Sequence, residues 1–222
     1  MATLRVHDST EYWKKTDLMV KPASYPIAVG YDVPSVDTIH RPLTLDLSEV
    51  CHEDRVYWAV RRAQDILLSS LALVALSPLL LITYAAIWID SPGASPIFTQ
   101  QRVGRNGKLF KMYKFRTMYV NAEENGPSLS SEDDLRVTPF GRIMRKYRLD
   151  ELPQFWNVLK GDMSLVGPRP ERKYFIERIV RKAPFYYLLH NVRPGITSLG
   201  MVKYGYAGSV DEMIERLEYD IL

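Results

Sequence analysis

Two adjacent carboxylates, Asp150 and Glu151, are the residues of this chain whose types and spacing best suit catalysis. They lie within a strongly basic stretch that ends in the sequence GDMSLVGPRPE. Arginine binds phosphate through two parallel hydrogen bonds and lysine acts as a point charge, so cations beside carboxylates suggest a phosphate-bearing ligand. The basic residues of this stretch are Lys111, Lys114, Arg116, Arg142, Arg145, Lys146, Arg148 and Arg169.

Both features also have simpler interpretations. The basic residues would equally attract anionic lipid without specificity. An acidic pair at the start of a helix usually caps it and interacts with its dipole, and Pro153 suits a first helical turn. In the catalytic interpretation, a carboxylate attacks phosphorus, and Mg²⁺ held at Asp150 and Glu151 neutralises phosphate oxygens. The residues alone leave these alternatives open.

A long uncharged segment distinguishes this sequence from that of an average soluble protein. Residues 66–89 are 24 consecutive residues without charge. As a straight helix they would extend about 36 Å, against a hydrocarbon core of about 30 Å. The alternative is a buried helix of a soluble protein, but such helices are rarely apolar on all sides at this length. We therefore expect this segment to lie in a membrane.

The middle of this segment predicts a break. Pro78 removes a backbone donor and clashes with the carbonyl of Val74, while Ser77 can hydrogen-bond the freed carbonyl. Arginines and lysines flank the segment on both sides, whereas the positive-inside rule places them on the cytoplasmic side only. A helix that bends at Ser77-Pro78 and returns to the same face satisfies this rule. A kinked span remains the alternative.

The rest of the chain predicts a helix-rich α+β domain. Residues 97–118 read as two strands around Asn106-Gly107, a strong hairpin signal. We expect helices over residues 140–150 and from Leu152 to Leu159, the second closed by Gly161. Residues 171–182 form a basic amphipathic helix that either packs on the core or lies at the lipid headgroups.

The composition of the chain excludes some classes of protein. The chain has 222 residues, a net charge of +3 and a single cysteine, Cys51. One cysteine excludes an internal disulfide framework and a zinc cluster built on several thiolates. Residues 1–56 are polar and rich in proline, and we interpret them as an extension. Residues 57–222 would then form the membrane-associated domain.

The sequence as a whole resembles the bacterial sugar transferases, the monotopic polyprenyl-phosphate phosphoglycosyl transferases. The resemblance runs from about Tyr57 to Leu222 and rests on four segments in the same order. These are RRAQDILLSSLALVALSPLLL, QQRVGRNGKLFKMYKFRTM, DLRVTPFGRIMRKYRLDELPQFWNVLKGDMSLVGPRPE and VRPGITSLG. Residues 1–56 have no counterpart in the minimal family core. Family members usually continue for a few tens of residues beyond the position of Leu222, so we expect a fragment or a short member.

The resemblance implies a fold and a site. It implies a re-entrant membrane helix broken at Ser77-Pro78, joined to a small cytoplasmic catalytic domain with amphipathic interfacial helices. The family's catalytic dyad matches Asp150-Glu151, with the aspartate as nucleophile, the glutamate as metal ligand or acid/base partner, and Mg²⁺ as cofactor. Its phosphate-binding arginine falls on Arg169, and its Lys-Phe-Arg element on Lys114 to Arg116. With Arg145, these are the predicted phosphate-binding residues.

The implied reaction moves a sugar 1-phosphate from a UDP-sugar to a polyprenyl (undecaprenyl) phosphate and releases UMP, through an aspartyl-phosphosugar. It would be the first membrane step of exopolysaccharide or glycoconjugate synthesis, at the cytoplasmic face of the bacterial inner membrane. The expected partners are the UDP-sugar, polyprenyl phosphate and the lipid bilayer, and no nucleic acid. Two other readings stay open: a membrane-anchored scaffold that only binds anionic lipid or a partner, and a spanning enzyme of another phosphotransfer type. No residue set identifies the sugar or the oligomeric state.

Overall fold

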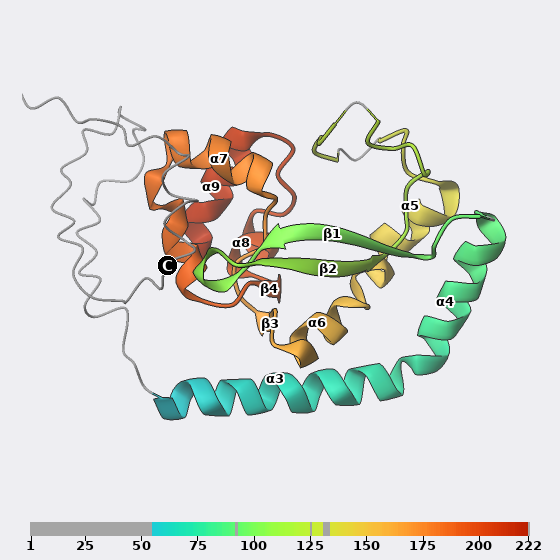
Figure 1. Ribbon diagram of the computed structural model, residues 1–222, viewed down its shortest axis with the longest axis horizontal. Helices are drawn as coiled ribbons and strands as arrows, with labels where there is room; N and C mark the ends of the chain where they lie inside the picture. Colours follow the sequence, from blue (N-terminus) through green and yellow to red (C-terminus); the bar gives the residue numbers. More distant parts are fainter. Residues whose placement is uncertain (1–54, 92, 125, 131–133, 222) are drawn as a thin grey trace, which may run out of the picture.

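The computed structural model describes residues 55–91, 93–124, 126–130 and 134–221 (Figure 1). The expected extension over residues 1–56 lies outside the described residues, except for its last two, which begin the first helix. The acidic segment between Tyr119 and Arg136 is described only in part.

A bent pair of helices, α3 (Arg55–Ala75) and α4 (Ser77–Asp90), runs along one side of the molecule (Figure 1). The two axes meet at 62°. The Ser77 hydroxyl donates a 2.8 Å hydrogen bond to the carbonyl oxygen of Val74, which Pro78 cannot satisfy because it has no N–H. The predicted break at Ser77-Pro78 is confirmed, with the predicted substitute hydrogen bond.

Helices α3 and α4 are long and apolar enough to cross a membrane only when they are taken together. Among the described residues, no single helix combines the length and apolar composition needed to cross a membrane. The pair α3 and α4 does so together, on length and composition alone.

A hairpin carries the chain from α4 back across the body. Strands β1 (Ile97–Val103) and β2 (Leu109–Phe115) pair antiparallel, with Ile97 opposite Phe115. The turn between them adopts positive φ at Asn106 (57°) and Gly107 (72°), a conformation that Asn and Gly tolerate best. The hairpin predicted around these two residues is confirmed.

The remaining elements are short and mostly helical, as the α+β expectation requires. Strands β3 (Ser164–Val166) and β4 (Gly195–Thr197) form a second, parallel two-stranded sheet, with Ser164 paired to Gly195 and Val166 to Thr197. In chain order the elements are α5 (Pro139–Lys146), the 3₁₀ turn η2 (Leu149–Glu151), α6 (Gln154–Lys160), β3 (Ser164–Val166), α7 (Lys173–Lys182), the 3₁₀ segment η3 (Pro184–Asn191), β4 (Gly195–Thr197), α8 (Leu199–Lys203) and α9 (Val210–Ile221).

Two predicted helix boundaries need correction. The helix expected over residues 140–150 ends at Lys146, because Arg148 takes a left-handed conformation with φ 58°. The helix expected from Leu152 begins at Gln154, and Gly161, with φ 88°, follows its last residue as predicted.

The largest apolar core lies between α7, η3 and α9. Phe175, Ile176 and Ile179 of α7 are buried there against Leu217 of α9. The apolar face of the basic amphipathic helix therefore packs into the protein, which favours the core-packing alternative over a position at the lipid headgroups.

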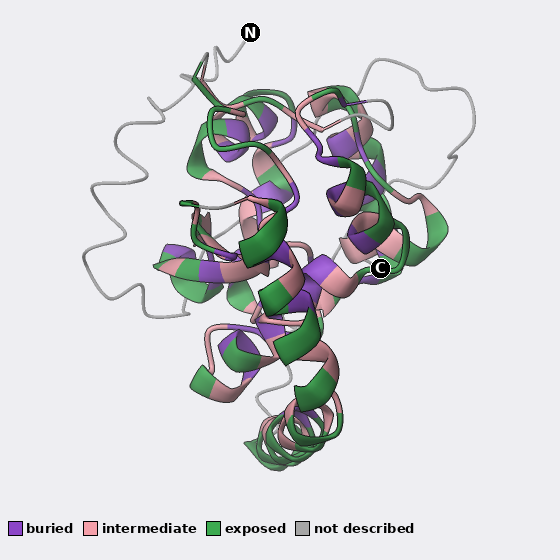
Figure 2. Ribbon diagram, turned by 90° about the vertical axis from the view of Figure 1, so that its right-hand side faces the viewer, coloured by how far each residue is buried: buried purple, intermediate pink, exposed green. Residues whose placement is uncertain are grey.

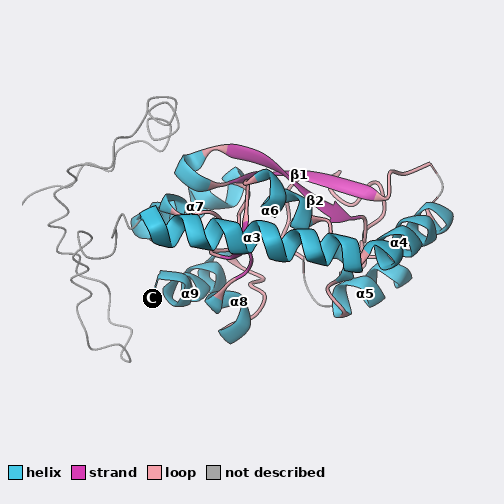
Figure 3. Ribbon diagram, turned by 90° about the horizontal axis from the view of Figure 1, so that it is seen from below, coloured by secondary structure: helices cyan, strands magenta, loops and turns pink. Residues whose placement is uncertain are grey.

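Helix α3 is attached to the body by polar side chains. Arg62 donates hydrogen bonds to the carbonyl oxygens of Val158 (2.6 Å) and Leu159 (2.8 Å), in the last turn of α6. Asp65, 4% exposed, accepts hydrogen bonds from the Ser164 hydroxyl (3.1 Å) and the Leu165 amide (3.0 Å) at the start of β3. The view from below shows α3 lying across the body along most of its length (Figure 3).

The opposite side of α3 is apolar and uncovered. Leu67, Leu71 and Val74 are 62–73% exposed. Figure 2 views α3 end-on at the bottom of the molecule, where exposed residues cover its outward side. The helix is thus polar where it meets the body and apolar where it faces away.

Candidate active site

Asp150 and Glu151 occupy the 3₁₀ turn η2, between α5 and α6. Both side chains are buried, 7% and 6% exposed. The residues before η2 and α6 are Arg148 and Pro153, and neither helix start has a side-chain cap. The capping interpretation of the acidic pair is therefore not supported, and the burial of two adjacent carboxylates needs another explanation.

Two cations from distant segments neutralise Glu151. Its Oε1 atom lies 3.2 Å from Nζ of Lys114, on β2, and 3.3 Å from Nη2 of Arg169, in the segment after β3. All three side chains are at most 17% exposed. Lys114, Glu151 and Arg169, predicted as site residues, are thus brought together.

The two carboxylates differ in their tendency to ionise. Burial alone would raise the pKa of Glu151, but Arg169 and Lys114 outweigh it and lower the pKa to about 2. For Asp150, burial is the largest effect and raises the pKa, with Lys114 offsetting part of it and the negative charge of Glu151 adding to it. Glu151 is a fixed anion, whereas Asp150 is the more basic carboxylate.

The pKa values of Lys114 and Arg169 shift in opposite directions. Burial lowers the pKa of Lys114 to about 8, despite the opposing effect of Glu151. Burial acts in the same direction on Arg169, but Glu151 and Glu171 outweigh it and raise the pKa of Arg169 above its usual value. Arg169 stays charged at all relevant pH values, and Lys114 can lose its proton in mildly basic solution.

The backbone that carries Arg169 is held by a close contact between glycines. Gly167 donates a 2.9 Å hydrogen bond to the Thr197 carbonyl, and Gly195 donates one of 2.9 Å to that of Pro168. A Cβ atom on Gly195 would lie 2.2 Å from the nitrogen of Gly167. The motifs GPRP and VRPG therefore meet at positions where only glycine fits.

A buried carboxylate fixes the other end of the same segment. Glu171, 5% exposed, pairs through one oxygen with Arg102 of β1 (2.9 Å) and through the other with Arg216 of α9 (2.7 Å). Arg102 also donates to the Pro170 carbonyl, at 3.0 Å. Arg169 is thus held between two anchored points.

Two other predicted phosphate-binding residues lie differently. Arg145 donates hydrogen bonds to the hydroxyls of Thr117 (3.0 Å) and Ser130 (2.6 Å), and its charge offsets part of the rise in the pKa of Asp150. Arg116 donates to the Ser95 carbonyl at 2.8 Å. Within the described residues, neither arginine hydrogen-bonds to Asp150 or Glu151, so both lie outside the central group.

Tyr206, which no sequence motif predicted as a site residue, lies between two cations near the dyad. Arg148 donates a 2.5 Å hydrogen bond to the Tyr206 hydroxyl and lies 4.5 Å from the ring centroid. The guanidinium carbon of Arg169 lies 5.8 Å from the same centroid. Glu171, the anchor of the Arg169 segment, was also missed, although it ends the quoted motif.

The carboxylates of Asp150 and Glu151 suit a metal site that is completed by water and substrate phosphates. No group of three or more His, Cys, Asp or Glu side chains that could hold an ion is found in the part of the chain described. Mg²⁺ is commonly held by one or two carboxylates together with water and substrate phosphates. Asp150 and Glu151 therefore fit an Mg²⁺ ion that binds together with a diphosphate, and do not form a complete protein cage.

The comparisons with known proteins identify the class. A family model described as bacterial sugar transferase matches residues 56–222. The chain belongs to the bacterial sugar transferase family, which confirms the resemblance seen in the sequence.

Individual relatives are similar over most of this chain. It is 46% identical over 165 residues to the UDP-N-acetylgalactosamine-undecaprenyl-phosphate N-acetylgalactosaminephosphotransferase of Aeromonas hydrophila, covering 74% of this chain and 39% of the relative. It is 42% and 39% identical, each over 165 residues, to the UDP-glucose:undecaprenyl-phosphate glucose-1-phosphate transferases of Klebsiella pneumoniae and Caulobacter vibrioides. These matches cover 73% and 72% of this chain, and 35% and 61% of the relatives. The chain thus spans only part of the length of these relatives.

Proposed function

We propose that this chain transfers a sugar 1-phosphate from a UDP-sugar to undecaprenyl phosphate and releases UMP. The observation that carries the proposal is the buried pair Asp150-Glu151, in which a basic carboxylate lies beside an anion paired with Lys114 and Arg169. The reaction class agrees with the printed names of the relatives. Their names differ in the sugar, so we leave the sugar open.

Asp150 is the nucleophile in this proposal. Its ionised carboxylate attacks the β-phosphorus of the UDP-sugar, the bond from that phosphorus to the bridging oxygen breaks, and UMP leaves. The product is an aspartyl-phosphosugar. An oxygen of undecaprenyl phosphate then attacks the same phosphorus, which breaks the bond to Asp150 and restores the carboxylate. A carboxylate of raised pKa suits this role, because a more basic oxygen is a better nucleophile.

Glu151 supports the reaction without exchanging a proton. With a pKa of about 2 it is ionised throughout the physiological range, so it suits a metal ligand better than an acid/base partner. Arg169 and Lys114 would bind phosphoryl oxygens and stabilise the charge that develops on them. Mg²⁺ held at Asp150 and Glu151 would supply Lewis-acid neutralisation of the diphosphate.

The bent pair α3 and α4 would place this site at a membrane. In the proposal, the pair enters the lipid and returns to the cytoplasmic face of the bacterial inner membrane. Its apolar outward side and the basic residues on both flanks support this arrangement.

UMP release from a panel of UDP-sugars, with Mg²⁺ and with EDTA, tests the proposal. We expect release with at least one UDP-sugar, its loss in EDTA and recovery on adding Mg²⁺. Asp150→Asn should lower the rate by on the order of 10⁴-fold. Asp211→Asn, the same change at an exposed ion pair with Lys182, should leave it unchanged. Without undecaprenyl phosphate, intact-protein mass spectrometry should detect the added sugar phosphate on the wild type and on Asp211→Asn, but not on Asp150→Asn.

The outcomes separate the alternatives. Near-normal UMP release by a folded Asp150→Asn variant would exclude the nucleophile assignment. Absence of UMP release from every UDP-sugar, with intact binding to anionic vesicles, would favour the scaffold that only binds lipid.

A further inference from the structure

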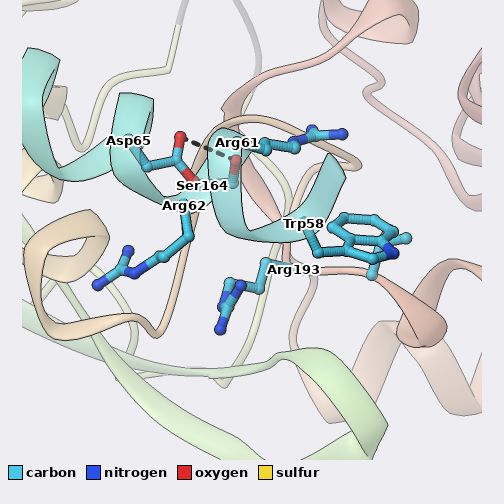
Figure 4. Close-up of a pocket in the computed structure, with 7 residues that line it drawn as sticks. Trp58, Arg61, Arg62, Asp65, Ser164 and Arg193 are labelled. Atoms are coloured by element: carbon cyan, nitrogen blue, oxygen red, sulfur yellow. Dashed lines mark hydrogen bonds between the residues drawn. The ribbon is translucent and has the colours of Figure 1, made fainter. Parts of the chain in front are cut away.

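A second group of cations lies near the start of α3, where Trp58 is located. Arg61 and Arg62 lie on α3, Arg105 at the tip of the β1–β2 hairpin, and Arg193 in the loop before β4. With Trp58 they define what we call the Trp58 pocket. Figure 4 shows Arg61, Arg62 and Arg193 with Trp58 along the same pocket, with Arg62 pointing away from the indole; Arg105 is not drawn.

Within the described chain, the carboxylate of Asp65 offsets only part of the positive charge of this pocket. The guanidinium carbons of Arg61 and Arg105 lie 5.6 and 5.9 Å from the centroid of the Trp58 ring. Burial and the charges of three neighbouring arginines lower the pKa of Arg193, and the charge of Asp65 opposes part of this effect. No ion pair between these arginines and a carboxylate is found among the described residues.

Existing hydrogen bonds orient these arginines while leaving them charged. Arg61 donates to the Val166 carbonyl (2.5 Å) and Arg193 to that of Gly161 (3.1 Å). The carboxylate in the pocket, Asp65, already accepts hydrogen bonds from Ser164 and Leu165 (Figure 4). Each arginine has five N–H donors, so donors remain for a ligand. The arginines of the pocket can therefore donate hydrogen bonds to an anion at its mouth.

Its position favours a lipid as the source of that anion. Trp58 precedes the uncharged segment by eight residues, about 12 Å along a helix, which corresponds to the headgroup level when that segment lies in lipid. Tryptophan is enriched at this level of membrane proteins. The outward side of α3 is apolar, so acyl chains could lie against it.

We propose that the Trp58 pocket binds the phosphodiester headgroup of an anionic phospholipid. The site is separate from the dyad and requires membrane association, but not the chemistry proposed for Asp150. It would fix the depth and rotation of α3 at the membrane surface, and with it the height of the attached body.

The test uses the full chain in a neutral detergent and a short-chain phospholipid, dihexanoyl phosphatidylglycerol, as the probe. The melting temperature should rise saturably with its concentration, and not with dihexanoyl phosphatidylcholine. Inorganic phosphate should require at least about tenfold higher concentrations to give the same rise in melting temperature, because it has no acyl chains to contact α3. Arg105→Gln, at an exposed side chain, should weaken the lipid effect about fivefold.

Matched variants control for charge and for the active site. Arg181→Gln makes the same change at an exposed position on α7 and should leave the lipid titration unchanged. Asp150→Asn should bind the lipid as the wild type does, so failure of the proposed function does not affect this test. Equal effects of phosphatidylcholine or of inorganic phosphate would overturn the proposal. So would an Arg105→Gln titration that matches the wild type or the Arg181→Gln control.

Discussion

Lys114 of β2 and Glu151 of η2 form a buried ion pair of 3.2 Å between segments 37 residues apart. The pair joins the hairpin to the turn that carries the dyad. Its two members also have displaced pKa values, about 8 for Lys114 and about 2 for Glu151, and this displacement makes the pair open to a kinetic test.

The first prediction concerns basic pH. Above pH 8 Lys114 loses its proton, and both its pairing with Glu151 and its attraction for phosphate oxygens are lost. The kcat/KM for UMP release, which reports the free enzyme, should therefore fall as pH rises through about 8. Lys114→Arg should move this decline to higher pH, since arginine does not deprotonate in this range. An unchanged decline in that variant would assign it to another group.

The second prediction concerns the anchor of the Arg169 segment. Glu171→Gln leaves Arg102 and Arg216 buried without their counter-charge, which should cost about 3–5 kcal/mol of unfolding free energy. The melting temperature should fall by roughly 10 °C. Glu123→Gln, at the more exposed pair with Arg172, should cost less than about 1 kcal/mol. Equal shifts in the two variants would contradict the anchoring role.

The third prediction concerns the membrane path of α3 and α4. In a Cys51→Ser background, Val60→Cys and Ser95→Cys place one thiol before α3 enters the apolar segment and one after α4. If the pair is re-entrant, a membrane-impermeant maleimide should label both from the cytoplasmic side only. Labelling from opposite sides would demonstrate a span.

The bend itself can be altered in the same assay. Pro78→Ala restores an N–H that can bond the Val74 carbonyl, so the two helices can straighten. We expect part of the Ser95→Cys population to become accessible from the opposite side in that variant. Ser70→Ala, a small change away from the bend, serves as the control.

The fourth prediction concerns the attachment of α3. Asp65→Ala leaves the Ser164 hydroxyl and the Leu165 amide without their acceptor, which should cost about 1–3 kcal/mol. Asp65→Asn retains a side-chain oxygen and should recover most of that loss. Urea unfolding and hydrogen exchange at the Leu165 amide measure both effects. A loss of equal size in both variants would show that the charge matters more than the hydrogen bonds.

Features set by neighbouring residues could be predicted from the sequence. Asn106-Gly107 accepts positive φ, Ser77-Pro78 removes and replaces one hydrogen bond, and Gly161 ends α6. Each depends on contacts within about four residues. The end of α5 was missed because the left-handed conformation of Arg148 is unusual for a residue with a side chain.

Features set by distant segments needed the structure. The amphipathic pattern of α7 fits a protein core and a lipid surface equally, and only its packing against α9 distinguishes them. Spacing likewise could not show that Glu151 meets Lys114 and Arg169, or that Arg116 and Arg145 bond elsewhere. The family resemblance placed the dyad in a site, whereas its ionisation states follow from burial and from charges supplied by other segments.

The hydrogen bonds from Arg62 to the last turn of α6 have a practical consequence for preparing this protein. A membrane anchor that is only a tether can be deleted to yield a soluble enzyme. Here α3 also supplies the cation at the C-terminal end of α6, through Arg62, and the acceptor at the start of β3, through Asp65. Deleting α3 would leave these backbone groups without their hydrogen-bond partners and expose the side of the domain that α3 covers. If α3 and α4 enter the membrane as proposed, purification should keep the helix pair intact, in detergent or nanodiscs.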